Sequence, residues 1–266
     1  TTRVTRSLRG GSPARQAFLA IMCFAGCLFA TPGCSIELTR LPAGFVRLRD
    51  IDETIVQDIR YATATNFTGA VVPGYQAGEC ILLREVAEAL KLVQSDLRPR
   101  DLSLKVYDCY RPVRAVKAFM QWVRTPATPG EGRYWPRTQR GDLVKLGYIA
   151  SNSIHSTGAA VDLTLVPLTA TQATPFRAGA VYAGCNAASF AREPDNGLDM
   201  GTSFDCFDKM SYADSAEITA EHRENRRLLL EAMLARSFKN YFREWWHFTY
   251  VGVPRLAKAQ DFVITK

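Results

Sequence analysis

The sequence is short of histidine, and it lacks the features of several protein classes. Only three histidines occur in its 266 residues. No low-complexity tract and no internal repeat is found, which excludes repeat architectures and is typical of a globular chain. No Lys/Arg run with interleaved aromatic residues occurs, so we expect no nucleic-acid partner. The length suffices for one ordinary hydrophobic core.

The first 34 residues hold four arginines and no acidic residue, and without these arginines the formal charge of +7 falls to +3. The apolar run 17–30 is short for a membrane span but suits a signal h-region. We predict a signal peptide over residues 1–34 and export to the periplasm, with a short anchor or a buried helix as alternatives. A lipid on Cys27 or Cys34 is a further option, because a glycine precedes each. Membrane contact is expected only through this segment.

Four cysteines remain after that segment, and no C-x-x-C spacing indicates zinc ligation by them. An even number of cysteines in an exported chain favours disulfides. Among three connectivities we favour Cys80–Cys109, which would tie a helix start to the strand before Arg111, and Cys185–Cys206, which would close a long loop. Four buried thiols are the alternative for a cytosolic protein.

One histidine lies close to an aspartate in a strand-like segment. His155 precedes Asp162 by seven residues. Polar and apolar residues alternate in residues 160–165, which predicts a strand with one apolar face and Asp162 on the other. Gly158 predicts a turn before this strand, so His155 can fold back beside Asp162.

A second histidine, His247, lies in residues 246–251, where alternating aromatic residues predict another strand. Glu244 lies just before that strand. We hypothesise that His155, Asp162 and His247 bind one zinc ion, because two imidazoles and a carboxylate leave the fourth tetrahedral position open for a hydrolytic water. Glu244 would then be the base that activates this water. The alternative is that each histidine is an ordinary hydrogen-bonded residue.

The rest of the chain predicts a single-domain α+β fold. Strands are expected at residues 58–63 and 101–107, and helices at residues 82–97, 112–123 and 219–236. We expect the helix at 112–123 to bury Val113, Val116, Met120 and Val123, and the helix at 219–236 to turn Leu230, Met233 and Leu234 inward. Residues 125–147 are expected to run over the surface, and residues 167–218 to form a lid or binding loop. Because strands and helices alternate without a βαβ rhythm, we expect a mainly antiparallel sheet flanked by helices.

Five motifs in order along the chain resemble those of one family. They are residues 60–69, residues 107–112, Ser153-x-His155-x-x-Gly158-x-x-Val161-Asp162, residues 199–208, and Glu244-x-Trp246-His247. Together they resemble the zinc D,D-peptidases of the Hedgehog/D-Ala-D-Ala peptidase fold, in particular the VanX-type D-alanyl-D-alanine dipeptidases. The resemblance runs from about residue 58 to the C-terminal strand. It departs from the family pattern at Ile154 and Thr157, beside the predicted metal loop.

The resemblance implies a role for each matched residue. It implies one zinc ion per chain, held by the three ligands already named, with Glu244 as general base. Arg111 would stabilise the oxyanion, although an ordinary ion pair with Asp108 is the alternative. Tyr61, Ser153 and Asp205 match positions that bind the ends of the substrate, and Asp205 would bind a free ammonium group.

The implied activity is hydrolysis of the free dipeptide D-Ala-D-Ala to D-alanine by residues 35–266, in cell-wall turnover or glycopeptide resistance. One alternative is a D,D- or L,D-carboxypeptidase that acts on peptidoglycan stem peptides. Another is a non-catalytic, zinc-stabilised module that binds wall peptides. The oligomeric state does not follow from the sequence.

Overall fold

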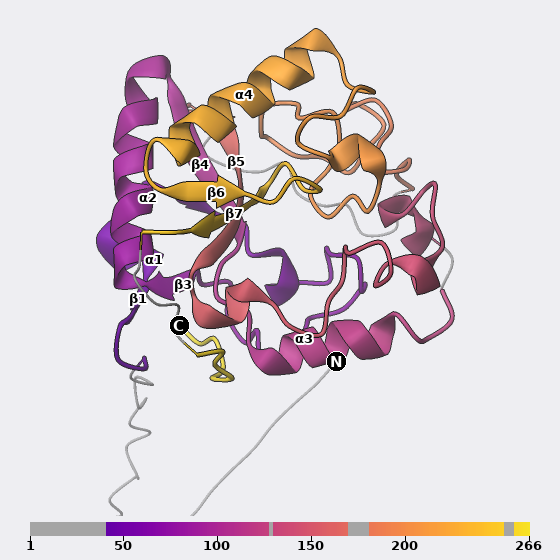
Figure 1. Cartoon of the computed structure of the whole chain (residues 1–266), viewed down its shortest axis with the longest axis horizontal. Helices are drawn as coiled ribbons and strands as arrows, with labels where there is room; N and C mark the ends of the chain where they lie inside the picture. Colours follow the sequence, from indigo (N-terminus) through magenta and orange to yellow (C-terminus); the bar gives the residue numbers. More distant parts are fainter. Residues whose placement is uncertain (1–40, 128–129, 170–180, 253–257) are drawn as a thin grey trace, which may run out of the picture. The chain divides into compact units, whose positions relative to one another are not determined.

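A five-stranded sheet (Figure 1) carries two of the three predicted metal ligands, Asp162 and His247. In spatial order its strands are β2 (Val56–Gln57), β4 (Leu102–Asp108), β5 (Ala160–Pro167), β7 (His247–Tyr250) and β6 (Phe238–Asn240). β2 runs parallel to β4, and the other neighbouring pairs are antiparallel. A separate antiparallel pair joins β1 (Phe45–Arg47) to β3 (Ile81–Leu83). The predicted α+β class with a mainly antiparallel sheet is thereby confirmed.

The computed structural model describes residues 41–127, 130–169, 181–252 and 258–266. The predicted signal segment, with Cys27 and Cys34, lies outside these ranges. Within them, no helix is both long enough and apolar enough to cross a membrane. Both predicted disulfides, Cys80–Cys109 and Cys185–Cys206, are present.

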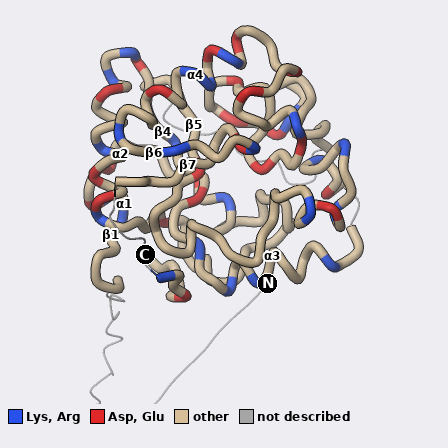
Figure 2. Tube along the Cα trace, in the orientation of Figure 1, with Lys and Arg blue, Asp and Glu red and all other residues tan. Residues whose placement is uncertain are grey.

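Two helices pack against each other and against the sheet: α2 (Arg84–Leu97) on β4, and α4 (Ala220–Leu234) on β5 and β6 (Figure 1). α2 buries the apolar row that its helical spacing predicts. Thr219 caps α4 by accepting a hydrogen bond from the His222 backbone N–H, as its position at the predicted helix start suggests. Lys/Arg and Asp/Glu residues both occur along the two helices (Figure 2).

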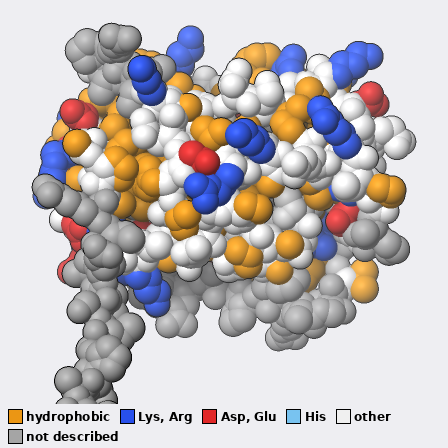
Figure 3. Space-filling view, turned by 90° about the horizontal axis from the view of Figure 1, so that it is seen from below, with side chains coloured by type: hydrophobic (Ala, Val, Ile, Leu, Met, Phe, Trp, Pro, Cys, Tyr) orange, Lys and Arg blue, Asp and Glu red, His pale blue; other side chains and the backbone are white. Residues whose placement is uncertain are grey.

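α3 (Val113–Trp122) lies below the sheet in Figure 1, whereas α4 lies above it. Pro112 is the N-cap of α3, so the helix begins at Val113, one residue after the predicted start. Val116 and Phe119 face a cavity between this helix and the sheet. On the face seen from below, Lys and Arg side chains are spread among apolar and neutral groups (Figure 3).

The remaining helices are single short turns in the connections. They are α1 (Leu48–Ile51), η1 (Arg60–Ala62), η2 (Arg98–Arg100), η3 (Glu131–Tyr134), η4 (Arg140–Asp142), η5 (Ile154–Thr157) and η6 (Lys209–Ser211). The described parts of residues 167–218 are irregular apart from η6, as the sequence predicts. Asp208 caps η6 by accepting from the Met210 backbone N–H.

The strand predicted at residues 58–63 is wrong. β2 ends at Gln57, and the 3-10 turn η1 follows. The Asn66 side chain holds this turn closed, because its amide donates to the backbone oxygens of Thr63 at 2.7 Å and Ala70 at 2.9 Å. A side chain that bonds to nearby backbone competes with strand pairing, and the local pattern of residues does not reveal it.

Two predictions about burial are also wrong. Leu234 was expected to face inward but is half-exposed, because α4 ends there and Leu229 and Met233 fill the core. Residues 125–147 were expected to lie on the surface, yet Trp135 and Leu143 are buried in the main core. Apolar contact therefore anchors this segment despite its many turn-forming residues.

Candidate metal centre and active site

Strand pairing brings two of the predicted ligands together. Asp162 on β5 lies directly opposite His247 on β7 and, on its other side, opposite Asp108 on β4. Residues directly opposite in an antiparallel pair project to the same face, with Cβ atoms about 4.5–5.5 Å apart. Three strands thus place a row of polar side chains across one face of the sheet.

His155 reaches this row from η5, which ends at Gly158. Gly158 has a φ of +75°, and a Cβ there would overlap the ring of Phe45, so the turn requires glycine. His155 Nδ1 lies 2.7 Å from the carbonyl oxygen of Cys109. Because a carbonyl only accepts, Nδ1 carries the hydrogen, and the lone pair of neutral His155 is on Nε2, which faces Asp162 and His247.

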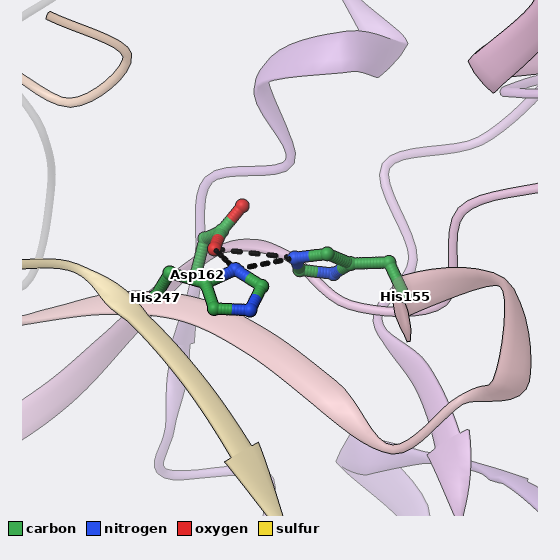
Figure 4. Close-up of side chains that lie close together, drawn as sticks. All are labelled: His155, Asp162 and His247. Atoms are coloured by element: carbon green, nitrogen blue, oxygen red, sulfur yellow. Dashed lines mark hydrogen bonds and ion pairs between the residues drawn. The ribbon is translucent and has the colours of Figure 1, made fainter. Parts of the chain in front are cut away.

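The three candidate ligand atoms form a nearly equilateral triangle (Figure 4). His155 Nε2 lies 3.0 Å from His247 Nδ1 and 3.2 Å from Asp162 Oδ1, and the latter two atoms are 3.0 Å apart. A tetrahedral ion with bonds of about 2.0–2.1 Å to nitrogen and oxygen would separate its ligands by about 3.3–3.4 Å. The triangle is only slightly tighter than that spacing, so His155, Asp162 and His247 fit one ion.

The charges in this triangle suit a cation. Burial raises the pKa of Asp162, but the neighbouring His155 and His247 outweigh burial and hold that pKa below its usual range. Burial lowers the pKa of His247. The carboxylate is therefore ionised and the His247 imidazole neutral near pH 7, which are the forms that bind metals.

Arg111 extends from the end of β4 over the same row. Its Nε donates to Asp108 Oδ2 at 2.8 Å, and its Nη2 lies 3.3 Å from Asp162 Oδ2. Tyr75 donates its hydroxyl to the other Asp108 oxygen at 2.6 Å. The guanidinium also lies over the Tyr61 ring, 5.2 Å from its centroid. The ion pair between Arg111 and Asp108 is therefore present. It holds the Arg111 guanidinium at the wall of the cavity.

Glu244 lies on a turn immediately before β7. Its backbone N–H donates to Tyr241 at 2.9 Å, and the Asn240 side chain donates to the backbone oxygens of Glu244 and His247, each at 3.0 Å. Its Oε2 lies 4.0 Å from His247 Nδ1. Burial raises the pKa of Glu244 well above its usual value, and the carboxylates of Asp162 and Asp205 raise it further. A carboxyl with raised proton affinity beside the triangle is suited to general-base chemistry.

Asp205 lines the same cavity, in a left-handed conformation with a φ of +57°. The Tyr61 hydroxyl is 3.0 and 3.2 Å from its two carboxylate oxygens. Burial raises the pKa of Asp205, and the charge of Asp162 raises it further. A cationic group that entered the cavity would favour the ionised form of this carboxyl and lower its pKa.

All eight residues predicted to bind metal, substrate or reacting groups line one cavity of about 280 Å³. They are Tyr61, Arg111, Ser153, His155, Asp162, Asp205, Glu244 and His247. This volume lies near the lower end of the roughly 300–1,000 Å³ typical of small-molecule sites. Aromatic side chains, including Phe67, Phe119 and Phe207, form part of its wall. The cavity therefore combines a candidate metal centre with room for a small ligand.

The chain is similar in sequence to known proteins over most of its length. The family model described as D-ala-D-ala dipeptidase matches residues 42–174 and 187–264. The chain belongs to that family. A D-alanyl-D-alanine dipeptidase of Enterococcus faecium is 32% identical over 222 residues, which cover 83% of this chain and 98% of that protein. A D-alanyl-D-alanine dipeptidase of Streptomyces coelicolor is 33% identical over 78% of this chain and 91% of its own length. One of Escherichia coli is 29% identical over 72% of this chain and 76% of its own length.

Membership confirms the family predicted from the five motifs, and with the His/Asp/His cluster it identifies the protein as a metallopeptidase. Several residues that shape the site were missed. Tyr75 and Asn240 act through partners far along the chain or through backbone, and Phe119 lies on a helix whose buried stripe was assigned to other positions. The segment 147–152 also lines the cavity, although no motif marked it.

Proposed function

We propose that this protein is a zinc-dependent dipeptidase that hydrolyses free D-Ala-D-Ala to two molecules of D-alanine. The observation that supports this most strongly is the convergence of the eight predicted residues on one cavity. The similar proteins from three bacteria carry the name D-alanyl-D-alanine dipeptidase. The small cavity volume supports a dipeptide as the substrate.

The donor set supports zinc as the metal. Two neutral imidazoles and one carboxylate are a common protein ligand set for catalytic zinc, and His155 donates its other ring N–H to a backbone carbonyl, as metal-binding histidines generally do. A zinc ion held there would polarise the substrate carbonyl and lower the pKa of a bound water to about 7.

In this proposal Glu244 moves the proton. Its carboxylate accepts a proton from the attacking water and returns it to the amine of the departing D-alanine. The raised pKa of Glu244 brings its proton affinity closer to neutral pH than that of an exposed glutamate. Asn240 fixes the turn that holds this carboxylate beside His247.

Arg111 stabilises the negative charge that develops on the carbonyl oxygen. Asp108 and Asp162 hold the guanidinium on one side, and the rings of Tyr61 and Phe119 lie beneath it. A donor fixed in advance in a partly buried site pays little reorganisation energy when charge develops.

Asp205 binds the free ammonium group of the dipeptide, with Tyr61 fixing its carboxylate. Ser153 also lines the cavity and is proposed to contact the second end of the substrate. An N-acylated dipeptide has no ammonium group for Asp205, so the enzyme should reject it. This selectivity separates a dipeptidase from a carboxypeptidase that trims longer stem peptides.

We also propose that residues 1–34 are a signal peptide and that residues 35–266 act in the periplasm, in wall-peptide turnover or glycopeptide resistance. Two disulfides support this location, because such bonds persist mainly in oxidising compartments.

Release of free D-alanine from D-Ala-D-Ala and from its N-acetyl derivative tests the proposal, with zinc supplied in both reactions. We expect hydrolysis of the free dipeptide alone. Equal hydrolysis of both substrates would instead indicate a carboxypeptidase. Binding of either compound without hydrolysis would indicate a non-catalytic module.

A further inference from the structure

We infer that the Cys80–Cys109 disulfide positions the metal ligand His155. Cys109 forms this disulfide, and its own carbonyl oxygen accepts the Nδ1–H of His155 at 2.7 Å. The bond thus anchors the group that fixes the ring orientation and tautomer of a proposed ligand. Both cysteines are buried and neither lines the cavity, so they are positioning residues. The inference rests on the proposed metal site.

Backbone hydrogen bonds of β3 connect the segment after Cys109 to the turn that carries His155. At one end of β3, the Ile81 carbonyl accepts from the Tyr110 backbone N–H at 2.9 Å. At the other end, the Leu83 N–H donates to the Gly158 carbonyl at 3.1 Å. β3 therefore contacts both the segment that follows Cys109 and the turn that carries His155.

The covalent bond acts at a point where Cys109 lies just beyond the regular sheet. β4 ends at Asp108, after a register shift between Val106 and Asp108 relative to β5. Ladder pairing thus stops one residue before the carbonyl that orients His155. Changes to groups that orient a metal ligand typically weaken metal affinity by about 10–100-fold. We expect a loss near the lower limit, since the carbonyl is loosened and not removed.

The second disulfide provides a matched control. Cys185 and Cys206 are 21 residues apart, against 29 for Cys80 and Cys109, so the two bonds constrain unfolded loops of similar length. The carbonyl oxygen of Cys206 accepts hydrogen bonds from the Ser211 hydroxyl and the Asp208 backbone N–H, and not from a proposed metal ligand. Loss of this disulfide should reduce overall stability to a similar degree without loosening His155.

Zinc affinity tests the inference in protein with both disulfides formed. The double variant Cys80→Ala with Cys109→Ala and the control Cys185→Ala with Cys206→Ala are each titrated with Zn²⁺ against a chromophoric chelator, after circular dichroism has verified folding. We expect the dissociation constant to rise about tenfold in the first variant and to stay within about twofold of wild type in the control. Equal changes in both variants, or no change in the first, would overturn the inference.

A second measurement needs no metal and no activity. In metal-free wild-type protein, imidazole ¹⁵N chemical shifts should show His155 as the Nδ1–H tautomer, and in the first variant they should show a mixture of tautomers. Cys80→Val with Cys109→Ala refills core volume without restoring the bond, and it should give the same mixture. A wild-type spectrum from both variants would refute the positioning role of the disulfide. Failure of the wild-type protein to hydrolyse D-Ala-D-Ala would refute only the proposed function.

Discussion

Glu244→Gln removes the proposed base while it keeps the volume of the side chain. The carboxylate of Glu244 lies 4.0 Å from His247 Nδ1, on the rim of the ligand triangle but outside it. Turnover should therefore fall while metal binding persists. General-base catalysis typically contributes about 10²–10⁴-fold, and we expect kcat to fall by that factor.

The same substitution should stabilise the metal-free protein. Burial raises the pKa of Glu244 in the folded state. An acid whose pKa is raised on folding destabilises the fold at pH values above its unfolded-state pKa. This cost is full above the folded-state pKa, shrinks as the pH falls below it, and disappears near the unfolded-state pKa. Glutamine has no charge to bury. The metal-free variant should melt at a higher temperature than wild type at pH 8, and the difference should shrink as the pH is lowered.

Three assays test this prediction together: release of D-alanine, zinc content and thermal melting with and without metal. Glu53→Gln, which alters an exposed glutamate, is the matched control and should leave all three unchanged. Wild-type turnover in Glu244→Gln would show that another group takes the proton. Loss of zinc from that variant would show that Glu244 is a ligand.

Other predictions concern the rest of the site. Asp205→Asn should raise KM for D-Ala-D-Ala by roughly 10–100-fold, since a hydrogen bond to a charged group contributes about 1.5–3 kcal/mol; an unchanged KM in steady-state kinetics would exclude its contact with the ammonium group. Arg111→Ala should lower kcat about 10²–10³-fold. Arg111→Lys should restore only part of this kcat, because one ammonium cannot contact Asp108 and Asp162 with the geometry of a guanidinium. A wild-type kcat in Arg111→Lys would show that charge alone suffices. Gly158→Ala should lower the melting temperature and weaken zinc binding, because the φ of +75° disfavours alanine and the added Cβ would overlap Phe45. A wild-type melting curve and a wild-type zinc titration would contradict this account of the turn.

The ligand set could be predicted because its geometry is local on each strand. Alternation along residues 160–165 and 246–251 fixes which way Asp162 and His247 point, and a glycine marks the turn that returns His155. Only the register between β5 and β7 was missing, and the structure places the two residues directly opposite each other.

Features that depend on distant contacts could not be predicted in the same way. In the aromatic wall the ring centroid of Phe67 lies 4.8 Å from that of Phe119 and 5.1 Å from that of Phe207, although the three residues come from separate segments. The strand expected at residues 58–63 failed because the Asn66 side chain and the contact of Tyr61 with Asp205 stabilise a turn there. Local propensity cannot include such partners.

X-ray absorption at the zinc edge tests the central claim most directly, namely that His155, Asp162 and His247 hold one ion. We predict one zinc per chain with only nitrogen and oxygen neighbours at about 2.0–2.1 Å, and loss of that zinc in Asp162→Ala and in His247→Ala. A sulfur neighbour at about 2.3 Å, or full zinc occupancy in either variant, would contradict the account.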